Sequence, residues 1–187
     1  MKNQWMLRDF LIIVAGLFML TTMMLLIQHK SRKSADGAVD SPGQLVVTVT
    51  WPEGDNDVDV WLTGPGEPHP VGFHAPNGRL WNLLRDDLGK DNDPMPGNFE
   101  NAYTRGEPAG LYVVNVHCFR CATFPIPVTV ELREKAEDGT TVQIALAKVN
   151  LDHDKQEKTA FQFLVSGGKV GRDSVVNTYR TLLGYSQ

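Results

Sequence analysis

The sequence lacks the motifs that mark the common catalytic sites. It has no G-x-S-x-G, no H-E-x-x-H and no glycine loop that cradles phosphate, and these are the patterns of serine hydrolases, zinc proteases and nucleotide-binding enzymes. The histidines are scattered, and the adjacent pair Asp86 and Asp87 is a weak basis for a hydrolase dyad. We therefore expect no enzymatic activity.

Cysteine is scarce. The chain has two, Cys118 and Cys121, in a single C-x-x-C. A redox motif of this kind normally opens a helix in a βαβ unit, whereas here it follows an apolar stretch with the character of a strand. A zinc site needs two more ligands at suitable spacing. The favoured interpretation is a short structural disulfide at a strand end, with free thiols and metal or redox chemistry as the alternatives.

Basic residues are few after the N-terminal segment. Five of the 18 lysines and arginines, but one of the 22 acidic residues, lie before residue 34. The remainder therefore holds 13 basic and 21 acidic residues, a net charge of −8. Because phosphate binding needs a basic face, this balance argues against nucleic acid as a partner.

After residue 43 no convincing amphipathic helix is found, and short stretches alternate between apolar and polar residues, which is typical of strands. Residues 64–98 are irregular and rich in glycine, proline and asparagine, and residues 174–183 are compatible with an added strand or a short helix. The fold class that this pattern predicts is all-β, an antiparallel β-sandwich over residues 44–166. The predicted strands are residues 44–51, 57–63, 99–103, 110–118, 125–133, 140–151 and 159–165, with a hairpin turn at Asp138-Gly139.

Acidic residues gather on a turn that runs into the predicted strand 57–63. Asp57 and Asp59 alternate, so both side chains point to one side, and Glu100 is a further candidate ligand for one ion. Calcium takes six to eight oxygen ligands, commonly from loops, although no EF-hand spacing is present. The alternative is that these residues only populate solvated turns. Further candidate oxygen ligands are Asp55, Asn56, Asp86, Asp87, Asp91, Asn92, Asp93, Asn98 and Asn101.

The N-terminal segment contains one long apolar run, residues 10–27, with no charge and no proline. At ~1.5 Å per residue it is roughly 27 Å long, which predicts a transmembrane helix over residues 9–28 rather than a cleaved signal peptide. Before it we expect a short cytoplasmic segment, residues 1–8, and after it a linker, residues 29–43. Residues 167–187 form a C-terminal tail or added strand.

Asp9 stands at the start of this run. At 100° per residue it shares a helix face with Gly16, Leu20 and Met23, and a small residue such as glycine lets another helix approach closely. The alternative is that Arg8 and Asp9 are the interfacial flank of a plain anchor.

The segment over residues 5–27 resembles the single transmembrane helix of the ExbD, TolR and MotB proteins. The resemblance rests on Asp9 opening the helix and on Phe18 and Met19 at nine and ten residues beyond it. It implies that Asp9 binds and releases the driving ion. It also implies that two copies of the chain associate as a dimer inside a pentamer of a multi-helix channel-forming membrane subunit, a 5:2 complex.

The stretch over residues 45–133 resembles a secreted bacterial β-sandwich domain of unknown function. The matching features are a strand that ends in tryptophan, a D-x-D strand, a glycine-proline turn, an acidic-asparagine pair and a G-x-Y strand. In this chain they are Trp51, Asp57, Asp59, Gly64-Pro65-Gly66, Glu100-Asn101 and Gly110-Leu111-Tyr112. Gly66 stands where that turn usually carries an acidic residue, which weakens a metal site implied by the resemblance.

Two functions are compatible with these features. The first is the small aspartate-bearing subunit of a membrane motor or channel complex driven by the ion (proton) motive force, whose periplasmic β-sandwich contacts an envelope or cell-surface component. The alternative is a membrane-anchored extracytoplasmic binding module for calcium, carbohydrate or protein, with no transport role. Both place the chain in the inner (cytoplasmic) membrane as a single-pass protein, with its N-terminus in the cytoplasm and its C-terminal domain periplasmic or extracellular.

Overall fold

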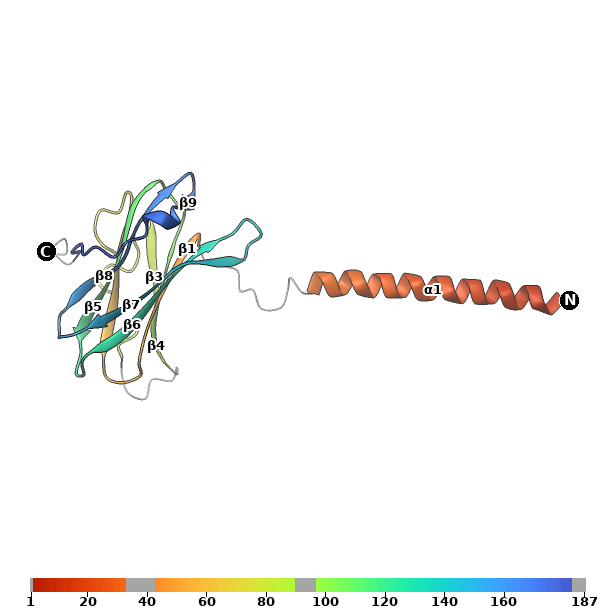
Figure 1. The fold of residues 1–187 in the computed structure, drawn as a ribbon, viewed down its shortest axis with the longest axis horizontal. Coiled ribbons are helices and arrows are strands. Elements are labelled where there is room, and N and C mark those ends of the chain that lie inside the picture. The colour runs from red at the N-terminus through yellow and green to blue at the C-terminus, as the bar shows by residue number, and fades with distance from the viewer. Residues whose placement is uncertain (1, 33–42, 90–96, 183–187) are drawn as a thin grey trace. The chain divides into compact units, whose positions relative to one another are not determined.

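The structure is a computed structural model of the 187-residue chain, and it describes residues 2–32, 43–89 and 97–182. The chain divides into two compact units, Met1–Val39 and Asp40–Gln187. The first contains the helix α1 (Lys2–Arg32) and the second contains all of the strands (Figure 1).

Helix α1 forms because its sequence is free of proline and rich in leucine and methionine, which lose little side-chain freedom in a helix. The hydroxyls of Thr21 and Thr22 donate back to carbonyls one turn earlier, those of Leu17 and Phe18 among them. These two threonines therefore satisfy their own polar groups inside the helix.

The structure corrects the prediction of a transmembrane helix over residues 9–28. The apolar run belongs to helix α1, whose side chains are described without a gap over residues 8–24. This stretch also includes the charged pair Arg8 and Asp9. Within the described residues, no helix is both long enough and apolar enough to cross a membrane. An N-terminal transmembrane helix is therefore not supported.

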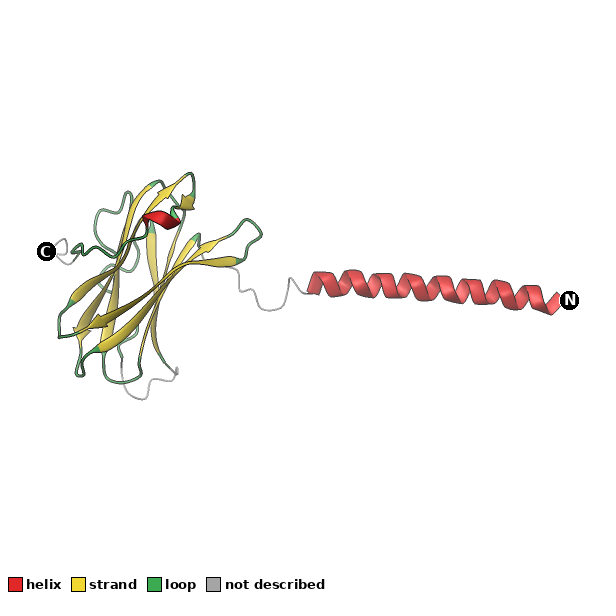
Figure 2. Ribbon diagram, viewed as in Figure 1, coloured by secondary structure: helices red, strands yellow, loops and turns green. Residues whose placement is uncertain are grey.

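The second unit is built from two antiparallel sheets (Figure 2). One sheet has five strands in the order β3-β4-β1-β6-β7, and the other has four in the order β2-β5-β8-β9. All strand pairs are antiparallel, which confirms the predicted all-β class and fits a β-sandwich. The strands are β1 (Leu45–Trp51), β2 (Asp57–Thr63), β3 (Trp81–Arg85), β4 (Asn98–Thr104), β5 (Gly110–Arg120), β6 (Ile126–Lys135), β7 (Thr141–Leu151), β8 (Glu157–Ser166) and β9 (Lys169–Val170).

The core lies between the two sheets and follows the alternation of the strands. In β1, Leu45, Val47 and Val49 are fully buried while the residues between them are half-buried or exposed. Tyr112 of β5 stacks on Phe163 of β8 at 5.1 Å between ring centroids. Burying each large apolar side chain contributes about 1.5–3 kcal/mol, so this inner layer holds the sheets together.

Strand β3 lies in the stretch that the sequence presents as irregular. Its start is fixed by Glu67, whose Oε1 accepts hydrogen bonds from the backbone N–H groups of Leu80 (2.6 Å) and Trp81 (2.9 Å). The Trp81 indole N–H donates to the carbonyl of Thr63 in β2. Strands β2 and β3 are each an edge of their sheet, so this contact shows that the two edges lie on the same side of the sandwich.

Two further segments pack on the four-stranded sheet. Val71 pairs with Leu62 of β2 through two backbone hydrogen bonds of 2.7 and 2.9 Å. The C-terminal segment contains a short 3-10 helix (Arg172–Ser174) and one bridge, from Val176 to Gln162, rather than the regular strand or helix expected over residues 174–183. Leu182 is buried against Trp61 and Val113. The tail therefore packs across the outer face of β2 and β5.

Candidate cation site

Glu100 lies on β4 and points inward, between the two sheets. It is 1 % exposed. Its Oε2 accepts a 2.5 Å hydrogen bond from the backbone N–H of Val60, on the edge strand β2. Its Oε1 is buried, and no donor within the described part of the chain reaches it. A buried carboxylate oxygen without a donor is costly, because nothing replaces the water that it lost.

Asp59 lies on β2, one residue before Val60, and is 2 % exposed. Its Oδ2 is 3.5 Å from Nδ1 of His117, the residue opposite it on β5. Burial raises the pKa of Asp59, and the contact with His117 partly offsets that effect. The β-ladder between β2 and β5 thus fixes both side chains.

Asp86 follows β3 and is exposed. Its position depends on the next residue, Asp87, which is buried and accepts hydrogen bonds from Arg85 Nη2, Gly89 N and Phe99 N at 2.8–3.1 Å. Burial alone would raise the pKa of Asp87, but these hydrogen bonds outweigh it and lower the pKa. The turn is tight at Gly89, where a Cβ would lie 1.9 Å from the Asn56 carbonyl oxygen and where φ is +55°.

These three segments bring Asp59, Asp86 and Glu100 together. Each offers one carboxylate oxygen, and the three oxygens lie within 4.8 Å of one another. Burial, followed by the charge of Asp59, raises the pKa of Glu100 well above its usual range. Among the residues that the structure describes, no lysine or arginine forms an ion pair with any of the three. A bound cation would neutralise the cluster, and a proton shared by Glu100 and Asp86 would reduce its charge.

The donor set decides which cation would fit. All three donors are carboxylate oxygens, which hard cations such as Ca²⁺ and Mg²⁺ prefer. Oxygens bound to one Ca²⁺ at about 2.4 Å lie no more than about 4.8 Å apart, and the three oxygens of the cluster lie within this limit. His117 contacts Asp59 and would hold the Asp59 carboxylate in position to bind the cation.

The sequence-based ligand set for this ion was Asp57, Asp59 and Glu100. The structure brings Asp59 and Glu100 together, and Asp57 is not one of the carboxylates whose oxygens lie within 4.8 Å of one another. It still lies near them, and its pKa is raised by burial and then by the charge of Asp59. The register between β2 and β5 shifts between Asp57 and Val58, and the Asp57 carboxylate faces Arg120 at 3.9 Å. Asp86 is the third residue of the observed cluster. The sequence offers it only as one of many acidic loop residues, and no spacing or motif distinguishes it from the others.

Most of the other oxygen ligands proposed from the sequence have structural partners. Asp55 pairs with Arg120 at 2.7 Å. The side-chain oxygen of Asn56 accepts from the backbone N–H groups of Ala122 and Thr123, and the Asn98 amide donates to carbonyls of the turn after β1. Asn101 keeps a buried side-chain oxygen without a partner among the described residues. Asp91, Asn92 and Asp93 lie outside the described residues.

Helix α1 carries the residues predicted to translocate an ion or to pack against another helix. Asp9 is exposed and its Oδ1 is 3.2 Å from Arg8. An added Cβ at Gly16 would meet nothing within 4 Å, and Leu20 and Met23 are exposed. The roles of these residues in ion translocation and helix packing stay predictions, as do the 5:2 complex, the dimer and the membrane location.

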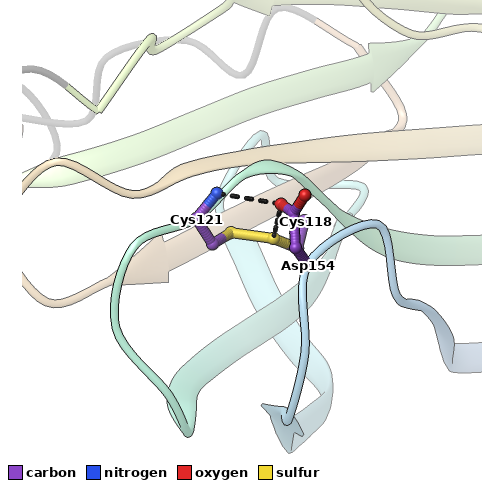
Figure 3. A group of neighbouring side chains, drawn as sticks. All are labelled: Cys118, Cys121 and Asp154. Carbon is purple, nitrogen blue, oxygen red and sulfur yellow. Dashed lines mark hydrogen bonds between the residues drawn. A yellow bond between two sulfur atoms is a disulfide. The ribbon is translucent and has the colours of Figure 1, made fainter.

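The predicted disulfide is confirmed. Cys118, at the end of β5, is bonded to Cys121, and the carboxylate of Asp154 lies beside the pair (Figure 3). Cys118 is fully buried and is part of the hydrophobic core.

Comparisons with known proteins identify no relative. No protein-family model matches the chain, and neither the curated proteins nor the solved structures contain a match. The resemblances to the ExbD, TolR and MotB helix and to a secreted β-sandwich family are therefore not supported. The function must be argued from the site itself.

Proposed function

We propose that the β-sandwich is a binding module whose ligand is a hard divalent cation, calcium foremost, held by Asp59, Asp86 and Glu100. The observation that carries the proposal is the buried Oε1 of Glu100, which no donor reaches within the described residues although two other carboxylates lie beside it. A cation would supply the missing partner and neutralise the charge.

The position of the cluster suggests what the ion does. Asp59 belongs to the edge strand β2, whereas Glu100 and Asp86 belong to β4 and to the turn after β3. One ion would therefore tie the edge of the four-stranded sheet to the edge of the five-stranded sheet. Since the unfolded chain lacks this arrangement, the ion stabilises the folded state, by about 2.7 kcal/mol at a concentration of 100 Kd.

The test is thermal unfolding of the protein after treatment with a chelator, with Ca²⁺, Mg²⁺ or Mn²⁺ then added back. We expect a concentration-dependent rise in Tm with at least one of these ions. Glu100→Gln, Asp59→Asn and Asp86→Asn should each abolish most of the rise. An unchanged Tm in the wild-type protein with all three ions would refute the proposal and favour the shared proton.

Asp57→Asn is the matched control. Asp57 is a buried carboxylate on the same strand, but it faces Arg120 and lies outside the cluster. This variant should keep the response to the cation. If it lost the response while Asp86→Asn kept it, the ligand set predicted from the sequence would be right and the one proposed from the structure would be wrong.

A further inference from the structure

We infer that reduction of the Cys118–Cys121 disulfide converts this corner of the sandwich into a second metal site, one for a borderline-soft cation such as Zn²⁺. The two thiolates and the Asp154 carboxylate would be its ligands. Each offers one atom, and these atoms lie within 4.8 Å of one another.

In the oxidised state, the Asp154 carboxylate contacts the sulfur of Cys118 without forming a hydrogen bond to it. Asp154 Oδ1 is 3.4 Å from Cys118 Sγ, but a disulfide sulfur carries no hydrogen to donate. The same oxygen accepts only from the backbone N–H of Cys121, at 3.2 Å, among the described groups (Figure 3). This position of the carboxylate is explained if the sulfur becomes a thiolate on reduction and if the thiolate and the carboxylate then bind the same cation.

The ligands are held in place without the disulfide. Backbone hydrogen bonds join Cys118 N to Gln156 O and Lys155 N to Cys118 O, at 2.9 and 3.1 Å. The ammonium group of Lys155 donates to the Phe119 carbonyl and lies over the Phe119 ring. These contacts fix the turn that carries Asp154 against the cysteine loop, so reduction would leave the site largely assembled.

The donor set indicates the metal. Two thiolates and one carboxylate suit Zn²⁺, with bonds of about 2.3 Å to sulfur and about 2.0–2.2 Å to oxygen. Two such sulfurs stand roughly 3.8 Å apart in a tetrahedral site, a separation that side chains with Cα atoms 5.9 Å apart can reach. Because Asp154 is exposed, a water molecule is able to complete the tetrahedron.

The chemistry balances with a dithiol as the reductant. The dithiol gives two electrons and two protons to the disulfide and closes to its own disulfide, which leaves two protein thiols. Zn²⁺ then displaces both thiol protons and binds the two thiolates. Reoxidation by a small-molecule disulfide, which takes two electrons from the thiolates and two protons from water and opens to a dithiol, would release the ion, so occupancy of the site would report the redox state.

The test is titration of the full chain with Cd²⁺, which gives thiolate complexes a charge-transfer absorbance, in the oxidised form and after reduction and removal of the reductant. We expect the band in the reduced form alone. Asp154→Asn should weaken binding by about tenfold or more, equal to about 1.4 kcal/mol. Asp152→Asn is the matched control, since this exposed aspartate of the same turn pairs with Lys158 instead.

Three outcomes would overturn the inference. They are equal binding by the oxidised protein, full affinity in Asp154→Asn, and no band in a reduced protein whose circular dichroism is native. If reduction alone unfolds the domain, the experiment instead measures whether the metal refolds it. Zn²⁺ should then restore the native spectrum of the reduced wild-type protein, and failure to do so would also contradict the site.

Discussion

The Glu100 side chain, on β4 of the five-stranded sheet, accepts a 2.5 Å hydrogen bond from the backbone N–H of Val60, on β2 of the four-stranded sheet. The bond joins the edge strand of the four-stranded sheet to the second strand of the five-stranded sheet. It also means that Glu100 has two tasks, one for each oxygen, and that substitutions can separate them.

Glu100→Gln and Glu100→Ala should differ in the absence of added cation. Glutamine keeps an oxygen for the Val60 N–H and carries no charge, so the free energy of unfolding should stay equal or rise. Alanine leaves that N–H without its partner and opens a cavity, which should cost about 1–3 kcal/mol for the lost hydrogen bond alone. Urea unfolding of both variants in a chelator measures the difference. Equal destabilisation by the two would show that the carboxylate charge, rather than the hydrogen bond, explains the role of Glu100.

The stability of the cation-free domain should fall as the pH rises above the ordinary range of carboxylates. Burial raises the pKa of Glu100 and Asp59, and raises that of Asp57 to about 6. The folded state then binds more protons than the unfolded state, so these groups contribute most below about pH 4 and lose that contribution as the pH rises through their folded pKa values. Tm measured across this range in a chelator should decline. Saturating cation should flatten the decline, because the ion replaces the proton.

Glu107 should make a separate contribution to this dependence. Burial, with the charge of Glu134 beside it, raises the pKa of Glu107 to about 7, and its Oε1 is buried without a donor among the described residues. Glu107→Gln should therefore raise Tm above pH 7 relative to the wild-type protein and leave it nearly unchanged near pH 5. The same variant should respond normally to cation, which distinguishes this group from the cluster.

The C-terminal segment should contribute to the stability of the sandwich through Leu182. This side chain is 1 % exposed and packs on Trp61 and Val113, so Leu182→Ala should cost about 2–5 kcal/mol. Val176→Ala is the control, because Val176 is half exposed in the same segment. An effect on Tm of similar size from both variants would mean that Leu182 is not the anchor of the segment.

The sequence predicts most of the strands because their alternation is local. Strand β1, for example, alternates along its whole length and its bounds were nearly those observed. Strand β3 was missed because its sequence does not alternate and its start depends on Glu67, 13 and 14 positions away from the residues that it binds. The same limit applies to the site. The shift between Asp57 and Val58, and the anchoring of the Asp86 turn by Asp87, depend on contacts between distant segments.

The sequence predicts a membrane-spanning helix from the apolar N-terminal run, and the motor function depends on that prediction. In the structure it forms one helix, but the transmembrane assignment is not supported within the described residues. The candidate function therefore lies in the sandwich, at residues whose roles depend on burial rather than on a motif.

The covered edge of β2 affects how readily two molecules of this chain can associate through strand pairing. Edge strands with unpaired N–H groups recruit strands from other molecules and lead to aggregation. Here the N–H of Val60 is taken by Glu100 and that of Leu62 by Val71. Glu100, from the other sheet, thus occupies an N–H group of β2 that an added strand would need for pairing.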